Sequence, residues 1–179
     1  LVYIIIKGTT NLGGNNMLYL MNINKDIRDR IKIYKDDKLI LIGKKEGAAA
    51  SFFDGFIGST YSKGAKFVIY KENFEYLTIE RNFYDDIKKY ILKYRDEEIG
   101  FIESIVKANT INIVIKFKKD EWNFSIKTDS QELEIENIGK IIPKKQRFTV
   151  YQEAEVEVED EEYEKLMFSL AIYIWDVFV

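Results

Sequence analysis

Hydrophobic and polar residues alternate over most of this chain, which is the pattern of β-strands that bury one face. The clearest alternating runs are 111–117, 122–127 and 148–158, the last with glutamates at every second position from Glu153 to Glu159. Val114 interrupts the polar face of the first run. Such runs place one face on a core and the other in water, as antiparallel strands do.

Short polar segments separate the alternating runs, at residues 35–38, 63–64, 95–98, 119–121 and 128–130. Strands at this spacing, with short polar connections, predict an antiparallel meander that closes into a barrel or a sandwich. Residues 45–63 lose the alternation, and a loop, a bulged strand and a short helical turn all remain open there.

An Ile-Gly pair recurs after turn signals, as Ile42-Gly43, Ile99-Gly100 and Ile138-Gly139, with Ile57-Gly58 as a candidate fourth copy. Glycine inside a strand marks a bulge or a place where the backbone packs against something bulky. A sheet wrapped around a helix needs such places. No copy has the glycine spacing of a nucleotide-binding loop, so packing is the favoured interpretation.

The alternation of apolar and polar residues ends after residue 160, and Tyr163 to Val179 is predicted to be a helix. Acidic residues, which stabilise the N-terminal end of a helix, begin at about residue 161, so the helical segment is taken to start there. From Leu166 onward only Ser169 and Asp176 are clearly polar. A helix that is apolar all round must be buried in a protein core or in a membrane. The residues predicted to fix this helix in the fold are Leu166, Leu170, Ala171, Ile174 and Asp176.

A membrane span is the weaker interpretation of this helix. Crossing a bilayer takes about 20 apolar residues, whereas this run is shorter and contains Asp176. We therefore expect the helix at the centre of the sheet, with Asp176 near its end and paired with a strand residue.

Composition sets the limits of the chemistry. The chain has 179 residues and one proline, Pro143, so we expect one domain without a linker. It contains no cysteine and no histidine, which excludes disulfides, thiolate chemistry and the commonest general base. The net charge of −3 argues against nucleic-acid binding, and no motif implies a cofactor.

Residues 1–16 have a separate interpretation. Leu12-Gly13-Gly14-Asn15-Asn16, back-translated with AT-rich codons, gives a purine-rich ribosome-binding site just before Met17. The hypothesis is that translation starts at Met17, so that residues 17–179 form the domain. The alternative is that Val2 to Ile6 forms a genuine strand followed by a turn. The abundance of Ile, Lys, Asn and Tyr points to an AT-rich, bacterial genome.

The Ile-Gly units and the ending Leu166-Met167-Phe168-Ser169-Leu170-Ala171-Ile172-Tyr173-Ile174-Trp175-Asp176 resemble the tubby C-terminal-like superfamily. That superfamily includes LURP-one-related proteins, their bacterial relatives and the phospholipid scramblases. The resemblance implies a closed antiparallel β-barrel of about twelve strands around a central hydrophobic C-terminal helix. Ala171 and Asp176 match the small residue and the aspartate of the family's helix. The cysteine-rich and acidic calcium-binding segments of scramblases have no counterpart, so scramblase activity is not expected.

In the tubby branch, clustered basic residues hold phosphoinositide head groups. The candidates here are Lys140, Lys144, Lys145 and Arg147 around Pro143, then Lys116, Lys118 and Lys119, and finally Lys44 and Lys45. Such a cluster attracts anionic lipid. The alternative is a set of solvated charges that keep the protein in solution.

The remaining polar patterns carry little chemistry. The acidic residues from Glu153 to Glu162 resemble a solvated strand face more than a cation site, because the calcium-loop spacing and its glycine are absent. A serine nucleophile would lack a histidine base, and no G-x-S-x-G motif is present. We therefore expect a protein that is not an enzyme.

Three functions remain open. The first is a non-enzymatic cytoplasmic domain that binds an anionic lipid, such as a phosphoinositide, or a partner at the inner face of the membrane. The second is a protein-interaction module of a bacterial stress or toxin–immunity system. The third, an enzyme with a pocket at the barrel end, has the least support from the sequence.

Overall fold

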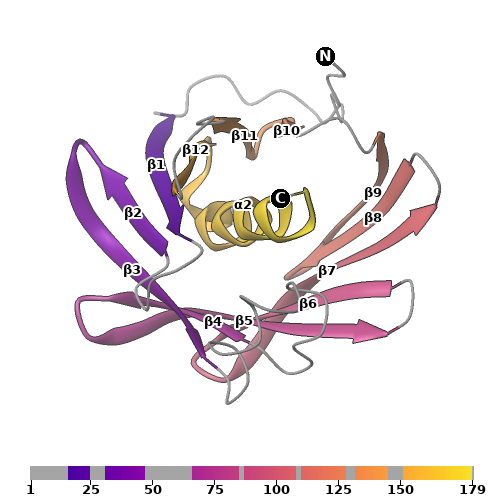
Figure 1. Ribbon diagram of the computed structural model, residues 1–179, viewed down its shortest axis with the longest axis horizontal. Helices are drawn as coiled ribbons and strands as arrows, with labels where there is room; N and C mark the ends of the chain where they lie inside the picture. The colour runs from indigo at the N-terminus through magenta and orange to yellow at the C-terminus, as the bar shows by residue number, and fades with distance from the viewer. Residues whose placement is uncertain are drawn as a thin grey trace.

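The computed structural model describes residues 16–24, 31–46, 66–84, 87–107, 110–127, 132–144 and 151–178. Within them the protein is mainly β, with a single 12-stranded antiparallel sheet and one α-helix at the C-terminus (Figure 1). The strands are β1 (Met17–Asn24), β2 (Ile31–Lys35), β3 (Lys38–Glu46), β4 (Lys66–Lys71), β5 (Phe74–Tyr84), β6 (Ile87–Tyr94), β7 (Glu97–Lys107), β8 (Thr110–Phe117), β9 (Asp120–Lys127), β10 (Leu133–Ile135), β11 (Gly139–Lys144) and β12 (Tyr151–Val158). The predicted antiparallel meander is confirmed.

The strand order is β10-β11-β12-β1-β2-β3-β4-β5-β6-β7-β8-β9, so the last three strands join the sheet beside the first. All eleven neighbouring pairs are antiparallel. In the described part of the chain, β9 and β10 are the two edges and are not paired with each other. The sheet is strongly curved, but the expected closed barrel is not confirmed.

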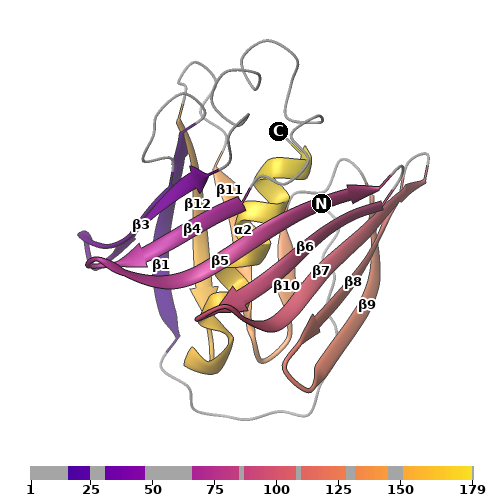
Figure 2. The ribbon, with the colours of Figure 1, turned by 90° about the horizontal axis from the view of Figure 1, so that it is seen from below.

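The curved sheet surrounds helix α2 (Glu164–Phe178), as Figures 1 and 2 show from two directions. A 3-10 turn, η2 (Glu161–Tyr163), leads into it, and the Asp160 carboxylate accepts a hydrogen bond from the Glu162 N–H at 2.9 Å. The predicted buried helix is therefore confirmed. Of the described helices, none is long and apolar enough to cross a membrane.

The core lies between α2 and the concave face of the sheet. Four of the helix residues singled out in the sequence, Leu166, Leu170, Ala171 and Ile174, are at most 5% exposed. The strands supply the opposite wall through alternating residues such as those of β8, where Ile111, Ile113, Ile115 and Phe117 are all buried. The inward-facing apolar residues of the strands thus pack against the apolar surface of the helix in a single core.

Tight turns collect at the end of the sheet where α2 begins. Turns of two residues connect β2 to β3, β4 to β5, β6 to β7 and β8 to β9. In the first and third of these turns both residues have positive φ angles, as type I′ hairpin turns require; they are Asp36 and Asp37, and Arg95 and Asp96. The turn predicted at 119–121 lies at residues 118–119 instead, because Lys118 takes the left-handed conformation and Asp120 already pairs with Phe117.

The glycines of the repeated Ile-Gly unit sit where the backbone is closely packed. A Cβ atom on Gly100 would lie 2.2 Å from the carbonyl oxygen of Lys116, and one on Gly139 would lie 2.1 Å from that of Glu157. The added Cβ at Gly139 would also be 3.0 Å from Cε of Met167 on α2. The packing interpretation is confirmed for these copies, whereas Gly58 lies outside the described residues.

Candidate functional site

The C-terminal end of α2 is tied to the sheet by a buried charge pair. Asp176 Oδ1 lies 3.1 Å from Nη1 of Arg81 on β5, and the two side chains are 3% and 1% exposed. The hydroxyl of Tyr90, on β6, donates to Asp176 Oδ2 at 2.7 Å. Burial, followed by the adjacent Asp176 carboxylate, raises the pKa of Tyr90 well above its ordinary value. The expected strand partner of Asp176 is therefore present, and it is an arginine.

Sequence reasoning did not find Arg81, although a signal exists. Arg81 follows Leu77 and Ile79 at every second position of β5, so it occupies an inward-facing place in an apolar row. A charge in such a row must be paired when the strand is buried. The signal is visible in the sequence, but only once the register of β5 is known.

A second polar cluster holds the N-terminal end of α2. The Glu164 carboxylate accepts hydrogen bonds from the hydroxyls of Tyr19 on β1 and Tyr76 on β5. Burial and this carboxylate together raise the pKa of both tyrosines above the usual range. Lys165 Nζ lies 4.1 Å from the ring centroid of Tyr76 and 4.7 Å from that of Tyr94. Strands on either side of the helix are thus linked through its first turn.

The side chains at the start of the helix also engage the β8–β9 hairpin. Tyr163 donates to Asp120 Oδ2 at 2.8 Å, and burial followed by this hydrogen bond raises the pKa of Tyr163 to about 12. Burial lowers the pKa of Lys165, and the nearby Lys118 and Lys71 charges act in the same direction. These contacts join helix and sheet, so both polar clusters are assigned a structural role.

Alkaline titration is expected to unfold the protein through its buried tyrosines. Each of Tyr19, Tyr76, Tyr90, Tyr163 and Tyr173 has a folded-state pKa above the ordinary value of 10.0. Their stabilising contribution is complete below pH 10 and is lost as the pH rises further, because only the unfolded chain then ionises freely. Urea unfolding at pH 8 to 11, followed with tyrosinate absorbance, measures this loss. A free energy of unfolding that stays constant up to pH 11 would contradict the prediction.

The basic candidates among the described residues lie on several strands, and three of them contact carboxylates. Lys118 Nζ is 3.0 Å from Glu162 Oε1, Lys140 Nζ is 3.8 Å from Glu134 Oε2, and Lys144 contacts Glu155. Lys116 and Lys119 are exposed on the β8–β9 hairpin, whereas Lys140 and Lys144 lie on β11, next to the edge strand β10. Lys145 and Arg147 lie outside the described residues.

Two further patterns from the sequence can be located. Lys44 Nζ lies 5.5 Å from the ring centroid of Tyr70, on the outer face of the sheet. The glutamates of β12 alternate with buried residues and are half-buried along the outer face. In the part of the chain that the structure describes, no group of three or more acidic residues is arranged to hold a metal ion.

An apolar surface on the outer face of β1, β2 and β3 has no counterpart among the sequence predictions. We call it the outer apolar patch, and it consists of Leu18, Leu20, Tyr34, Leu39 and Ile42. Leu18 is 59% exposed and Leu39 is 45% exposed, while the other three are half-buried. Tyr34 pairs with Leu20 on one side and with Leu39 on the other, so one apolar row crosses three strands.

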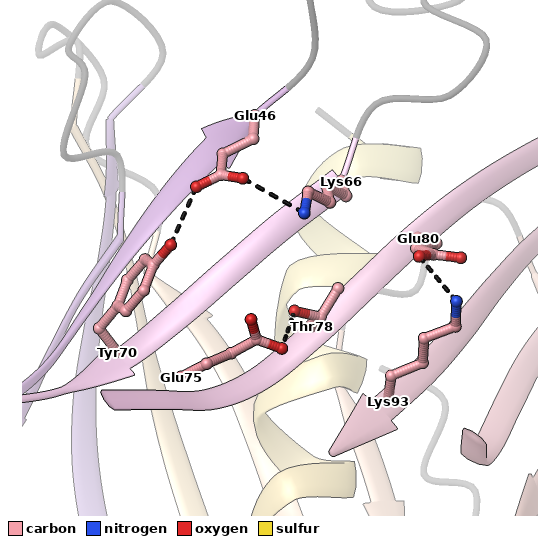
Figure 3. Close-up of polar contacts among 7 residues, drawn as sticks. All are labelled: Glu46, Lys66, Tyr70, Glu75, Thr78, Glu80 and Lys93. Carbon is pink, nitrogen blue, oxygen red and sulfur yellow. Dashed lines mark hydrogen bonds and ion pairs between the residues drawn. The ribbon is translucent and has the colours of Figure 1, made fainter. Parts of the chain in front are cut away.

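Charged and polar side chains border the outer apolar patch. On one side, Leu18 and Leu20 are the register partners of Glu157 and Glu155 on β12. On the other side, Ile42 is the register partner of Tyr70, whose hydroxyl donates to Glu46 at 2.9 Å. Glu46 also forms an ion pair with Lys66, whose Nζ lies 3.3 Å from Glu46 Oε2 (Figure 3). The Tyr70 hydrogen bond, followed by the Lys66 contact, lowers the pKa of Glu46.

Further along this outer face, on β5 and β6, the polar residues are already engaged with one another. Glu75 accepts from the Thr78 hydroxyl at 2.7 Å, and Lys93 pairs with Glu80 at 2.8 Å (Figure 3). Phe74 and Ile87 are also exposed, at the first positions of β5 and β6, but they lie on separate strands beside these paired charges, whereas the apolar row on β1 to β3 continues from strand to strand. A contiguous exposed apolar patch with a polar border is typical of a protein-binding surface.

No family model, curated protein or solved structure matches this chain. The tubby-like resemblance therefore stays a prediction.

Proposed function

We propose that this domain is a non-catalytic binding module that holds a partner protein on the outer apolar patch. The observation that carries the proposal is the exposure of Leu18 and Leu39 at 59% and 45% beside half-buried apolar neighbours. Leaving such side chains in water costs about 25 cal/mol per Å² of apolar area, a cost that a partner removes. The expected partner presents apolar side chains at its centre and polar groups around them.

The border of the patch supports a protein rather than an anionic membrane as the partner. Glu155 and Glu157 lie directly beside its leucines and the exposed Lys32 lies directly beside Ile42, so the border carries both signs of charge, as the polar rim of a protein interface does and a purely basic lipid-binding border does not. Of the basic residues predicted to hold lipid, three contact carboxylates of this chain, namely Lys118, Lys140 and Lys144. The tubby-like resemblance is compatible with either ligand, so the choice rests on the surface chemistry.

Affinity purification with matched variants tests this proposal. The wild-type domain and the variant with Leu18→Lys and Leu39→Lys are used as bait in an extract of the native host. We expect a stoichiometric partner that survives detergent with the wild type and is lost with the variant. The control is Phe74→Lys, because Phe74 is an apolar residue that is 76% exposed outside the patch. Equal recovery with all three baits would overturn the proposal.

A vesicle experiment separates the lipid alternative. Wild-type protein is sedimented at low salt with vesicles of phosphatidylcholine and phosphatidylglycerol, beside the variant Lys116→Glu with Lys119→Glu. We expect no co-sedimentation of either protein. Binding by the wild type that is lost in the variant and weakened by salt would favour the anionic-lipid function instead.

A further inference from the structure

Strand β9 is an unprotected edge of the sheet. It is eight residues long and pairs with β8 from Asp120 to Lys127 without a register shift. Among the described residues it has no second partner strand, and it lies at the margin of the sheet in both views (Figures 1 and 2). Folded proteins usually protect such edges with proline, bulges, charged side chains or short strands, and the charged residues of β9 are confined to its two ends, at Asp120, Glu121 and Lys127. β9 has neither proline nor bulge, while the other edge strand, β10, is only three residues long.

The inner face of β9 is also incompletely covered. Ile113 and Ile115 on the neighbouring β8 are 1% and 0% exposed, yet their register partners Phe124 and Trp122 are only half-buried. Trp122 packs on Tyr163, with ring centroids 6.0 Å apart. One more strand beside β9 would cover the exposed sides of these aromatic rings and use the free backbone groups of the edge.

We propose that this strand is β9 of a second copy of the protein, paired antiparallel about a two-fold axis at Phe124. In that register Glu121 of each copy stands opposite Lys127 of the other, and Asn123 stands opposite Ser125. On the inner face, Trp122 stands opposite Ile126 of the second copy, and the two Phe124 residues face each other. Each pairing occurs twice because the axis relates the copies.

The sequence of β9 is therefore complementary to itself when it is reversed. In sequence, an acidic position pairs with a basic one, short polar positions pair next to them, and large apolar positions pair with each other. Glu121, Asn123 and Ser125 are exposed, as this pairing requires. Their present contacts, Asn123 to Glu121 at 3.2 Å and Ser125 to Asn112 at 2.5 Å, involve side chains, and among the described residues no strand pairs with this backbone edge.

This dimer is independent of the proposed function. The outer apolar patch lies on β1 to β3 and β9 ends the sheet, so pairing through β9 leaves the patch of each copy accessible. The dimer would present two patches, which favours a partner that is itself multivalent. Closure of β9 onto β10 of the same chain, or capture of a strand from another protein, would each leave the purified protein monomeric.

Sedimentation velocity of the purified full chain over a wide range of concentration tests the proposal. We expect a reversible monomer–dimer equilibrium. Glu121→Lys places lysine opposite lysine twice, so it is expected to weaken the dimer by about tenfold or more. Glu121→Lys combined with Lys127→Glu restores opposite charges and is expected to restore the dimer. Glu98→Lys, the same charge change at an exposed site away from β9, is the control and should have no effect.

Cysteine pairing tests the register, since the natural chain has no cysteine. A mixture of Asn123→Cys and Ser125→Cys proteins is expected to form the mixed disulfide in preference to either symmetric one. A wild type that is monomeric at every concentration, or a dimer that Glu121→Lys leaves intact, overturns the proposal. The variant with Leu18→Lys and Leu39→Lys is expected to dimerise normally, so failure of one proposal is distinguishable from failure of the other.

Discussion

Replacing Ala171 by aspartate is expected to prevent the domain from folding to a soluble protein. Ala171 is 2% exposed in the middle of α2, between the buried Leu170 and Ile172. The substitution would bury a carboxylate without a partner, which costs several kcal/mol or shifts the group to its neutral form. Domains of this size are stable by only about 5–15 kcal/mol, so the loss is a large share of the total. Soluble yield and the thermal melting curve measure the effect.

Two further variants separate charge from size at this position. Ala171→Asn has nearly the same shape without the charge, so it should be less damaging than Ala171→Asp. Lys107→Asp introduces the same residue at an exposed strand position and should leave the melting curve close to that of the wild type. A normal melting curve for Ala171→Asp would mean that α2 is not buried in the protein in solution.

Removal of Asp176 is expected to be the next most damaging change. Asp176→Ala would leave the Arg81 guanidinium, 1% exposed, without its carboxylate. Breaking a buried ion pair from one side typically costs about 3–5 kcal/mol, because the remaining charge loses its buried counter-charge. The Tyr90 hydroxyl would lose its acceptor at the same time. Urea unfolding at neutral pH gives the change in the free energy of unfolding.

A double-mutant cycle shows whether the pair itself is responsible. Arg81→Met combined with Asp176→Leu removes both charges and fills the space with apolar atoms, so it should destabilise less than Asp176→Ala alone. Asp176→Asn keeps an acceptor for Tyr90 and should lie between the wild type and Asp176→Ala. The cycle is completed by Arg81→Met alone and Asp176→Leu alone. If the changes in unfolding free energy of these two single variants simply add in the double variant, the two side chains do not interact as described.

Much of this fold is already present in the spacing of apolar residues. Period-two alternation predicts strands such as β8 and β9, and the run after residue 160 predicts a helix without a polar face. The buried α2 follows from that run, because an apolar helix of this length needs protein on every side. Gly100 and Gly139 could be assigned to close packing because glycine has little other use inside a strand.

The candidate surfaces could not be predicted in the same way. Leu20 and Ile42 face water, yet in the sequence they look like core residues, because neither face of their strands is clearly polar. The register shift between Ile33 and Tyr34 helps to decide which side chains of β2 and β3 stand together. Alternation gives two faces of a strand but does not say which face is inside or what lies across from it.

The charged residues show the same division between sequence and tertiary structure. The sequence by itself predicted that Asp176 would pair with a strand residue, since an ionised carboxylate in an apolar helix is costly to bury without a partner. Only the tertiary structure selected Arg81, 95 positions earlier in the chain, and paired Lys118 and Lys140 with Glu162 and Glu134. The physical reason is that burial is a property of local spacing, whereas pairing depends on strand order and register. Both of these are set by contacts between residues distant in the sequence.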